Sequence, residues 1–328
     1  MTEAARCAGR VLIVANASAR GRPVDLIGDL ERIVENSGAE PMLLGPPGTP
    51  GNHPGDPDGG AARAVEMIQS AVLDDGPWSA VVSVGGDGTA RTCAEALAGS
   101  DVAMVIVPAG TGNSMYRALW ADAPWVETVE RVLNGSAGIR DIDLMTVKGE
   151  ESERTSTVLL GASAGLIAEV LAVSADLTDV SGRDRYSEAI GPALESHRPF
   201  PARITVDGDV IADGPVSLVA IGGARHRSGT FELLPRSILD DGLADVCVIG
   251  GVDAEGFVEL AGPVMVGEHI GHPAVTYAQG RNVRVERTDG LSLVFEHDGD
   301  MWPVEDRTVE VAVGGTVRMF APLVAEAG

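Results

Sequence analysis

The sequence predicts an α/β N-terminal half built on a parallel sheet, followed by a half that is mainly an antiparallel β-sandwich. Over residues 1–136, apolar strands alternate with helices, which is the pattern of a parallel sheet with helices on both faces. From Arg140 onward strands predominate, and Asp-Gly pairs separate several of them, as the hairpins of an antiparallel sheet require. We therefore place the domain boundary at the short linker Gly135–Gly138, with domains over residues 1–136 and 137–314.

Apolar runs mark the strands of the first half. Val81–Val84 and Val102–Val107 do not alternate with polar residues, so each is expected to be buried on both faces of the sheet. The other strands predicted in this half are Arg10–Ala15 and Glu40–Leu44. Helices are predicted from Pro23 to just before Gly38 and over Ala61–Leu73, Thr89–Leu97, Ser114–Trp120 and Pro124–Leu133. The Pro- and Gly-rich stretch Gly45–Gly60 is predicted to be a surface loop.

The second half is predicted to consist of short strands and few helices. The predicted strands are Asp141–Val147, Thr155–Leu160, Ala202–Val206, Val216–Ile221, Ala244–Ile249, Val283–Arg287, Leu291–Glu296 and Thr308–Val313. The predicted helices are Ile167–Ala175, Arg183–Glu195 and Ala254–Val266. The stretch Thr157–Ala175 has roughly the length of a membrane span. Glu169 and several Gly and Ser residues interrupt it, so we expect a strand followed by a buried helix.

The charge balance excludes several classes of partner. The 328 residues carry a formal net charge of −24, which argues against binding to nucleic acid and against electrostatic docking on anionic lipid. Lys148 is the only lysine. The chain therefore has neither a P-loop lysine nor the strand lysine of a protein kinase, and phosphate must be held by backbone amides, arginine or metal.

Cysteine and histidine usage indicates a reduced compartment. Cys7, Cys93 and Cys247 are scattered and have no metal-ligand spacing, and the histidines show no zinc pattern. The first ten residues are polar and lack a secretory pattern. We therefore expect a cytoplasmic protein, with peripheral contact at the inner membrane face left open.

Two glycine-rich loops follow neighbouring predicted strands. Gly85–Thr89 reads Gly-Gly-Asp-Gly-Thr, and Pro108–Asn113 reads Pro-Ala-Gly-Thr-Gly-Asn. Each loop is poor in side chains, so bare main-chain N–H groups can converge on an anion. The carboxyl ends of adjacent parallel strands also share one crevice. One such loop is weak evidence, but the pair one βαβ unit apart predicts a polyphosphate site.

At this pair of loops the sequence resembles the bacterial diacylglycerol-kinase-like lipid kinases, which share a superfamily with sphingosine kinases and NAD kinases. Further elements resemble the family's motifs in the same order: Asn16–Gly21, Ile142–Leu144, Pro235–Leu243 and Asp298–Asp300. The resemblance implies a Rossmann-like nucleotide-binding domain of the NAD-kinase and diacylglycerol-kinase type, then a β-sandwich. It also implies that a segment at about 315–328 packs back on the first domain.

The resemblance implies ATP and Mg²⁺ as cofactors and assigns roles to acidic residues. Asp298 resembles the proposed general base for the lipid hydroxyl, and Asp300 stands where the family has a glutamate. Asp87 resembles the residue that organises catalytic Mg²⁺ or shares in activating the acceptor. Asp241, with the carbonyls of Ile238 and Leu243, resembles a structural Mg²⁺ site. The residues that resemble nucleotide contacts are Asn16, Ser18, Gly85, Gly86, Asp87, Gly88, Thr89, Gly110, Thr111, Gly112 and Asn113.

The residues alone also permit plainer interpretations. The Asp-Gly pairs at 241–242 and 298–299 are common in β-turns, and without the resemblance the turn is the simpler interpretation. The chain also departs from the family after its first loop, since Thr92 stands where a glutamate is frequent, and Ala17 replaces a proline in the opening turn.

Our leading hypothesis is an ATP- and Mg²⁺-dependent kinase that phosphorylates a lipid hydroxyl, with diacylglycerol the default acceptor and phosphatidic acid the product. One alternative is an NAD kinase-like or sphingoid-base kinase, although the second loop suits the lipid kinases better. Another is a nucleotide-binding regulatory protein without turnover. We expect a lipid partner held in an apolar cleft between the domains, no nucleic acid, and transient membrane contact through exposed apolar residues such as Trp120 or Trp125. A homodimer is left open.

Overall fold

A computed structural model describes residues 9–15, 23–44, 59–177, 183–226 and 231–323, and these residues belong to two compact units. Unit 1 comprises Met1–Ile142 and Gly315–Gly328, and unit 2 comprises Asp143–Gly314. The divisions fall inside the two long strands β5 (Ala137–Gly149) and β15 (Thr308–Pro322), so two strands continue from one unit into the other. Asn16, Ser18, Cys7 and the loop residues 45–58 lie outside the described residues.

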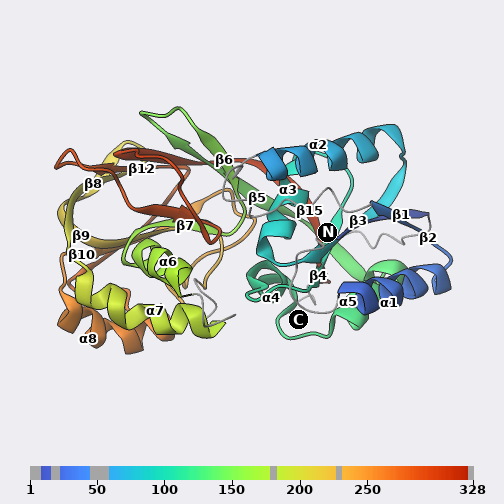
Figure 1. Cartoon of the computed structure of the whole chain (residues 1–328), viewed down its shortest axis with the longest axis horizontal. Helices are drawn as coiled ribbons and strands as arrows, with labels where there is room; N and C mark the ends of the chain where they lie inside the picture. Colours follow the sequence, from blue (N-terminus) through green and yellow to red (C-terminus); the bar gives the residue numbers. More distant parts are fainter. Residues whose placement is uncertain (1–8, 16–22, 45–58, 178–182, 227–230, 324–328) are drawn as a thin grey trace, which may run out of the picture. The chain divides into compact units, whose positions relative to one another are not determined.

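Unit 1 is a parallel sheet flanked by helices, as the alternation of its elements predicts (Figure 1). Its strands run in the order β15-β4-β3-β1-β2, and neighbouring strands in this order pair in parallel. The strands are β1 (Arg10–Ala15), β2 (Glu40–Leu44), β3 (Trp78–Gly85) and β4 (Met104–Pro108). The helices are α1 (Pro23–Asn36), α2 (Gly59–Asp74), α3 (Asp87–Ala96), α4 (Ser114–Trp120) and α5 (Trp125–Asn134).

The central strands, in which apolar and polar residues do not alternate, are buried as expected. Residues 11–15 of β1 are buried, and so are residues 80–85 of β3 and 104–107 of β4. A strand covered by helices on both faces has no solvent side on which a polar residue would be favoured. Helices α2 and α3 lie on one side of these strands in Figure 1, and α1 and α5 lie on the other.

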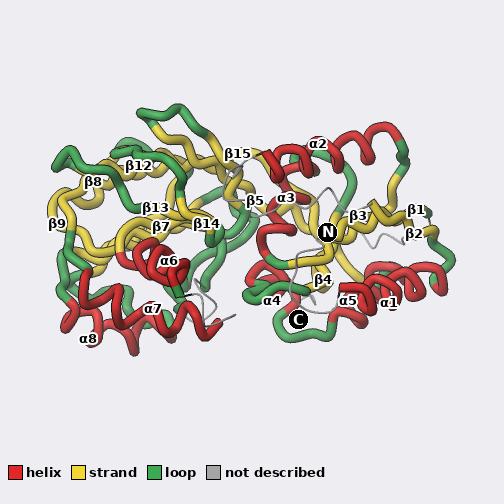
Figure 2. The backbone as a smooth tube through the Cα atoms, in the orientation of Figure 1, coloured by secondary structure: helices red, strands yellow, loops and turns green. Residues whose placement is uncertain are grey.

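Unit 2 is mainly antiparallel, and Figure 2 shows its many strands with the helices α6, α7 and α8 beside them. Its central strand β9 (Asp209–Gly222) pairs with β7, β8 and β10, and β8 continues the sheet through β12 to β15. The remaining strands are β5, β6 (Thr155–Val158), β7 (Gly161–Gly165), β8 (Phe200–Val206), β10 (Ala244–Gly250), β11 (Val275–Gly280), β12 (Asn282–Arg287), β13 (Phe295–His297) and β14 (Asp300–Met301). The predicted fold class, an α/β domain followed by a mainly antiparallel β domain, is confirmed.

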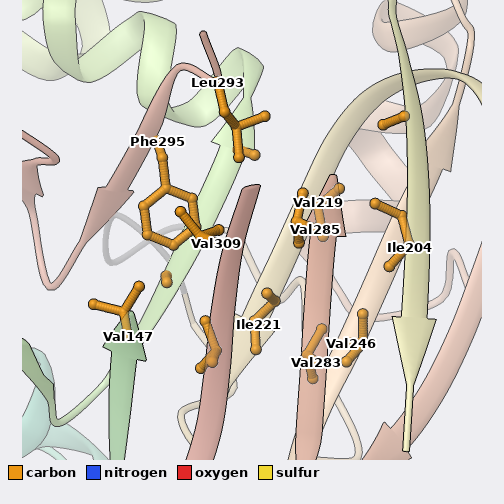
Figure 3. Packing of buried hydrophobic residues seen from close by; sticks show 14 of the residues in the cluster. Val147, Ile204, Val219, Ile221, Val246, Val283, Val285, Leu293, Phe295 and Val309 are labelled. Carbon is orange, nitrogen blue, oxygen red and sulfur yellow. The ribbon is translucent and has the colours of Figure 1, made fainter. Parts of the chain in front are cut away.

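Two hydrophobic clusters stabilise unit 2. The larger one fills the interior of the β structure, and Figure 3 shows part of it, in which Ile221, Val285 and Phe295 come from different strands. The smaller one lies between strands β9 and β10 and the helices α6 (Leu166–Asp176), α7 (Arg183–Ser196) and α8 (Ala254–Met265). Strands β9 and β10 therefore bury side chains on both faces, and three helices cover one of them.

The structure departs from the predicted strands where the residues are small or the pairing is long-range. Strand β7 (Gly161–Gly165) was not predicted, because Gly-Ala-Ser-Ala-Gly lacks β-branched residues, yet all five residues are buried. The predicted strand Leu291–Glu296 was largely wrong, since β13 starts only at Phe295. Among the described residues, no helix combines the length and the apolar character needed to span a bilayer.

Candidate active site

The two glycine loops of unit 1 begin at the same level of the sheet. Strands β3 and β4 are parallel neighbours, with Val81 opposite Met104 and Gly85 opposite Pro108. Each strand leads directly into its loop, and a helix follows each loop: α3 after the first and α4 after the second. The register therefore brings both loops to the carboxyl edge of the sheet, where the open-sheet rule places ligands.

The loops touch each other through their main chains. Ala109 N donates a 2.8 Å hydrogen bond to the Gly85 carbonyl. A Cβ atom on Gly110 would collide with the Cα of Gly86, and a Cβ on Gly86 would lie 3.1 Å from the Cα of Gly110. Gly110 requires glycine because the two backbones approach more closely than a side chain allows there, and a side chain at Gly86 would be tightly placed. The loops thus form one continuous surface.

Asp87 joins the first loop to the helix that follows the second. Its Oδ1 atom accepts a 3.0 Å hydrogen bond from Met115 N in the first turn of α4. A Cβ placed on Gly112 would lie 2.9 Å from Asp87 Oδ2, so this oxygen faces the second loop. Asp87 is also the first residue of α3, where the helix dipole favours a negative charge.

Asn113 shapes the second loop rather than extending a side chain away from it. Its amide donates to the Gly110 carbonyl at 2.9 Å, and Gly110 N donates to Asn113 Oδ1 at 2.9 Å. Asn113 has a positive φ of 51°, a conformation that asparagine tolerates better than most residues. The paired bonds close the loop and hold its remaining main chain in place.

The start of α3 is suited to bind an anion. Its N-cap is Gly86, and no side chain of a described residue caps the helix. Gly88 is exposed, and a Cβ built on it meets no described atom within 4 Å. Open space beside uncapped main-chain N–H groups is the arrangement that phosphate groups occupy at helix N-termini.

In unit 2, the motif Asp298-Gly299-Asp300 is a hairpin turn. His297 of β13 pairs with Asp300 of β14, and the two residues between them have positive φ values of 50° and 84°. These are the conformations that a tight two-residue hairpin requires, and Asp-Gly suits them. The plain β-turn interpretation of this motif is therefore correct for Asp298 and Gly299.

The carboxylate of Asp298 is bound by the main chain. It accepts hydrogen bonds from Leu159 N at 2.8 Å, Leu160 N at 2.8 Å and Gly161 N at 3.1 Å. Asp298 N in turn donates to the Gly161 carbonyl at 2.9 Å. Asp298 therefore fastens the hairpin to the chain between β6 and β7. Asp300, the next residue but one, is exposed.

Glu296 braces the same hairpin from the other side. Its Oε2 accepts a 3.0 Å hydrogen bond from Gly299 N, and its Oε1 accepts one from the Ser163 hydroxyl. Glu296 is 2% exposed. The carboxylate of Glu296, which is buried, and that of Asp298, which is bound by main chain, therefore hold the turn. The turn ends at the exposed Asp300. The sequence analysis missed Glu296, since nothing in its spacing distinguishes it from an ordinary strand residue.

A second acidic turn lies at Asp240–Leu243. Asp241 Oδ1 accepts from Leu243 N at 3.0 Å, and Asp143 Oδ2 accepts from Gly242 N at 2.7 Å. Burial raises the pKa of Asp143 above its ordinary value, and the charge of Asp241 raises it further. Burial likewise raises the pKa of Asp245, again with a contribution from Asp241.

The donor set at this turn fits Mg²⁺. The described residues contain no group of three His, Cys, Asp or Glu side chains arranged to hold a metal. Asp241 and the carbonyls of Ile238 and Leu243 offer only oxygen, the donor that Mg²⁺ prefers. Burial is the main cause of the raised pKa values of Asp143 and Asp245, and nearby acidic charge, including that of Asp241, adds to it; a bound cation would offset that added charge.

An apolar pocket in unit 2 was not predicted. It lies among α6, α7, α8 and strands β9 and β10, and its lining is almost entirely apolar. Its volume is about 100 Å³, and Leu166, Ile190, Leu218, Phe257 and Leu260 are among the residues that line it. The cleft expected between the domains is a different place, because every lining residue of this pocket belongs to unit 2.

The structure thus gathers the predicted residues into separate groups. Gly85–Thr89 and Gly110–Asn113 come together in unit 1, and Asp241 and Asp298–Asp300 lie in unit 2. Asn16 and Ser18 are outside the described residues. The expectation that Trp120 is exposed was wrong, since it is 4% exposed, and Trp125 is half-buried. Trp120 is the last residue of α4, and Trp125 is the first residue of α5.

Two family models match the chain, one after the other. Residues 10–147 match the diacylglycerol kinase catalytic domain, and residues 161–320 match the YegS C-terminal NAD kinase beta sandwich-like domain. The chain is 27% identical to the diacylglycerol kinase of Bacillus subtilis, over 75% of this chain and 79% of that protein. It is 29% identical to a Pseudomonas aeruginosa protein named "Probable lipid kinase YegS-like", over 81% and 82% of the two chains.

Solved structures support the fold independently. A crystal structure of a diacylglycerol kinase from Bacillus anthracis aligns with 96% of this chain and 97% of its own, with a TM-score of 0.66 and 17% identity. Such low identity speaks for the fold alone. The family models, the relatives and the joined glycine loops agree with one another. The chain therefore belongs to the diacylglycerol-kinase-like family of lipid kinases and is an ATP-dependent kinase acting on a lipid alcohol.

Proposed function

We propose that the chain transfers the γ-phosphoryl group of ATP to the free hydroxyl of diacylglycerol, giving phosphatidic acid. The observation that carries the phosphoryl transfer is the main-chain contact between the two glycine loops, bridged by Asp87. Several relatives are named diacylglycerol kinase, and this supports diacylglycerol over sphingoid bases and NAD as the acceptor.

The residues of unit 1 would bind the nucleotide. Main-chain N–H groups at the start of α3 and in the second loop are suited to the phosphate oxygens, because phosphoryl transfer depends chiefly on positioning and charge stabilisation. Asn113 keeps the second loop closed, and the exposed Gly88 leaves the approach open. The remaining contacts that we assign here are Gly85, Gly86, Thr89, Gly110, Thr111 and Gly112.

The hairpin of unit 2 would serve the acceptor. We assign proton acceptance to Asp300, whose carboxylate ends a turn held by Asp298 and Glu296. An aspartate reaches one methylene less far than a glutamate, so this assignment requires the turn to be rigid. The hydrogen bonds of Asp298 and Glu296 supply that rigidity, since each joins the turn to neighbouring main chain or to Ser163.

Mg²⁺ would be held at two places. Asp87 is suited to the nucleotide-bound ion, and Asp241 with the carbonyls of Ile238 and Leu243 is suited to a structural one. When bound, the ion supplies positive charge that offsets the charge of the phosphate oxygens. Asp87 keeps one carboxylate oxygen facing Gly112, while its other oxygen holds the start of α4.

The apolar pocket of unit 2 would take acyl chain. Its lining leaves a bound water without polar partners, so apolar matter is the favourable filling. We place the reaction at the cytoplasmic face of the membrane, with peripheral and transient contact, because diacylglycerol resides in the bilayer.

The test is a transfer assay with radiolabelled ATP and Mg²⁺, offered in parallel to diacylglycerol, sphingosine and NAD. We expect label in phosphatidic acid. If label appears in sphingosine phosphate or NADP instead, the proposed acceptor is wrong but the proposed nucleotide site stands. ATP binding without transfer to any acceptor would make the protein a regulator, and the proposal would then be abandoned.

A further inference from the structure

Helix α8 (Ala254–Met265) carries large apolar side chains on the face turned away from the protein. Val258 is 68% exposed, Met265 is 50% exposed, and Val266, directly after the helix, is 60% exposed. Residues 258 and 265 are two helical turns apart, so they lie on the same side of the helix. Single exposed apolar residues are normal on a protein surface, but three at one short helix form a stripe.

This stripe is continuous with the apolar pocket. The buried face of α8 contributes Phe257, Leu260 and Val264 to the pocket lining. Ala261 also lines the pocket, and it is exposed as well. Ala261 is three residues after Val258 and four before Met265, so apolar surface runs around the helix from the pocket to the stripe. Helix α8 therefore carries apolar side chains on its buried face and on part of its exposed face.

The ionisable residues of α8 itself, and Glu268 shortly after it, are acidic. Helix α8 contains neither lysine nor arginine, and its ionisable residues are Glu255 and Glu259, both exposed. Glu268, shortly beyond the helix, is also exposed. A surface of this kind gains nothing from anionic lipid headgroups and is repelled by them at low ionic strength. Its attraction to a lipid surface must come from burial of apolar side chains.

We propose that the stripe of Val258, Met265 and Val266 docks α8 on a lipid bilayer whose headgroups are zwitterionic or uncharged. The inference rests on the proposed function to the extent that a diacylglycerol acceptor must leave a bilayer. An interfacial helix buries its apolar face shallowly at the boundary between headgroups and acyl chains. Docking through α8 brings the helix that lines the apolar pocket into contact with the membrane from which an acyl chain enters.

The test is flotation of the full-length protein with phosphatidylcholine vesicles. The double variant Val258→Gln, Met265→Gln replaces two stripe residues that do not line the pocket. The matched control is Val210→Gln, Leu291→Gln, two residues of unit 2 that are 55% and 59% exposed elsewhere. We expect the stripe variant to bind vesicles at least about tenfold more weakly than the wild type, and the control to bind like the wild type.

The lipid composition of the vesicles and the oligomeric state of the protein test whether a bilayer or a second copy of the chain covers the stripe. We expect vesicles enriched in phosphatidylglycerol to bind more weakly at low salt than phosphatidylcholine vesicles do. Equal losses in stripe and control variants, or tighter binding to the anionic vesicles, would overturn the proposal. So would a wild-type dimer, seen by analytical ultracentrifugation, that the stripe variant converts to a monomer, because the stripe would then be covered by a second copy.

A second readout separates this inference from the proposed function. With a short-chain, water-soluble diacylglycerol and no vesicles, we expect the stripe variant to have the kcat/KM of the wild type. If the wild type phosphorylates no diacylglycerol in any form, the proposed function fails, while vesicle binding still tests the docking surface. A stripe variant that loses activity on the soluble substrate would place these residues in substrate binding and refute a docking role.

Discussion

The main-chain nitrogen of Met115 donates a 3.0 Å hydrogen bond to Asp87 Oδ1, and this bond links the first glycine loop of unit 1 to the helix that follows the second loop. Asp87 begins α3, and Met115 lies in the first turn of α4. The Gly-Gly-Asp-Gly-Thr motif therefore holds the start of α4 through the one acidic side chain that it contains. The other carboxylate oxygen of Asp87, Oδ2, faces Gly112 of the second loop.

Asp87→Asn separates these two tasks. Asparagine keeps an oxygen that can accept from Met115 N but removes the negative charge proposed to face Mg²⁺. We expect the melting temperature to change little and kcat to fall about 100-fold or more, the scale seen when a preorganised charge interaction is lost. Thermal unfolding and the transfer assay measure the two effects. Normal turnover in this variant would mean that the catalytic ion is held elsewhere.

Gly110→Ala tests the contact between the loops. The added methyl group would collide with the Cα of Gly86, so the loops must separate. We expect a loss of kcat/KM on the order of 100-fold, because displacements of about 1 Å at a phosphate site are that costly. The control is Gly28→Ala in α1, where an added Cβ meets no described atom within 4 Å. If Gly110→Ala binds ATP as the wild type does, the loops are not the cradle.

Asp298 and Asp300 should respond differently to substitution. Asp300→Asn is expected to leave stability unchanged and to reduce turnover by about 100- to 10,000-fold, the contribution typical of general-base catalysis. Asp298→Ala leaves the N–H groups of Leu159, Leu160 and Gly161 without their acceptor, and should lower the free energy of unfolding by about 1–3 kcal/mol. Urea unfolding and kcat together distinguish them. A fully active Asp300→Asn protein would return the base to Asp298.

The acidic turn at Asp241 should couple stability to pH and Mg²⁺. Because the pKa of Asp143 and of Asp245 is raised in the folded protein, the folded state binds protons more tightly than the unfolded state. Their contribution to stability is fully present below the ordinary aspartate pKa of about 4 and is lost as the pH rises through the raised values. At neutral pH both carboxylates are charged, and Mg²⁺ bound at the turn should offset that charge. The free energy of unfolding of the wild type at neutral pH should therefore be lower without Mg²⁺ than with it.

Asp241→Asn is the matched variant for this prediction. It removes a charge that raises both neighbouring pKa values, so metal-free stability at neutral pH should increase. Added Mg²⁺ should then stabilise the wild type but not the variant, as measured by melting temperature over a Mg²⁺ titration. Equal stabilisation of both proteins by Mg²⁺ would count against a metal site at this turn.

Filling the apolar pocket should alter acyl preference. Ile190→Phe enlarges a side chain that lines the pocket on α7. We expect kcat/KM for long-chain diacylglycerol to fall about tenfold and that for a short-chain analogue to change less, since a pocket discriminates by the apolar volume it can accept. Steady-state kinetics with both substrates provide the measurement. Equal losses on the two substrates would point to general misfolding instead of lost acyl binding.

Several features followed from local sequence because their physical cause is local. Strand β1 and helix α4 have the predicted bounds, and for β1 the reason is a short apolar run that ends at a polar turn sequence. Strand β7 did not follow, because its burial comes from neighbours β9 and β13, which are distant in the chain. The three helices of unit 2 were predicted from the sequence, but the pocket among them required their packing on β9 and β10.

By itself, the sequence determined the alternating elements of the first half, the Asp-Gly turns of the second and the glycine loops, since these depend on residues close together in the chain. Only the tertiary structure decided how the carboxylates are used. Asp298 is bound by amides from residues 159–161, and Glu296 by Ser163, and such long-range partners leave no trace in local spacing. Partners from distant strands therefore determine which acidic residue holds a turn and which one is left exposed at its end.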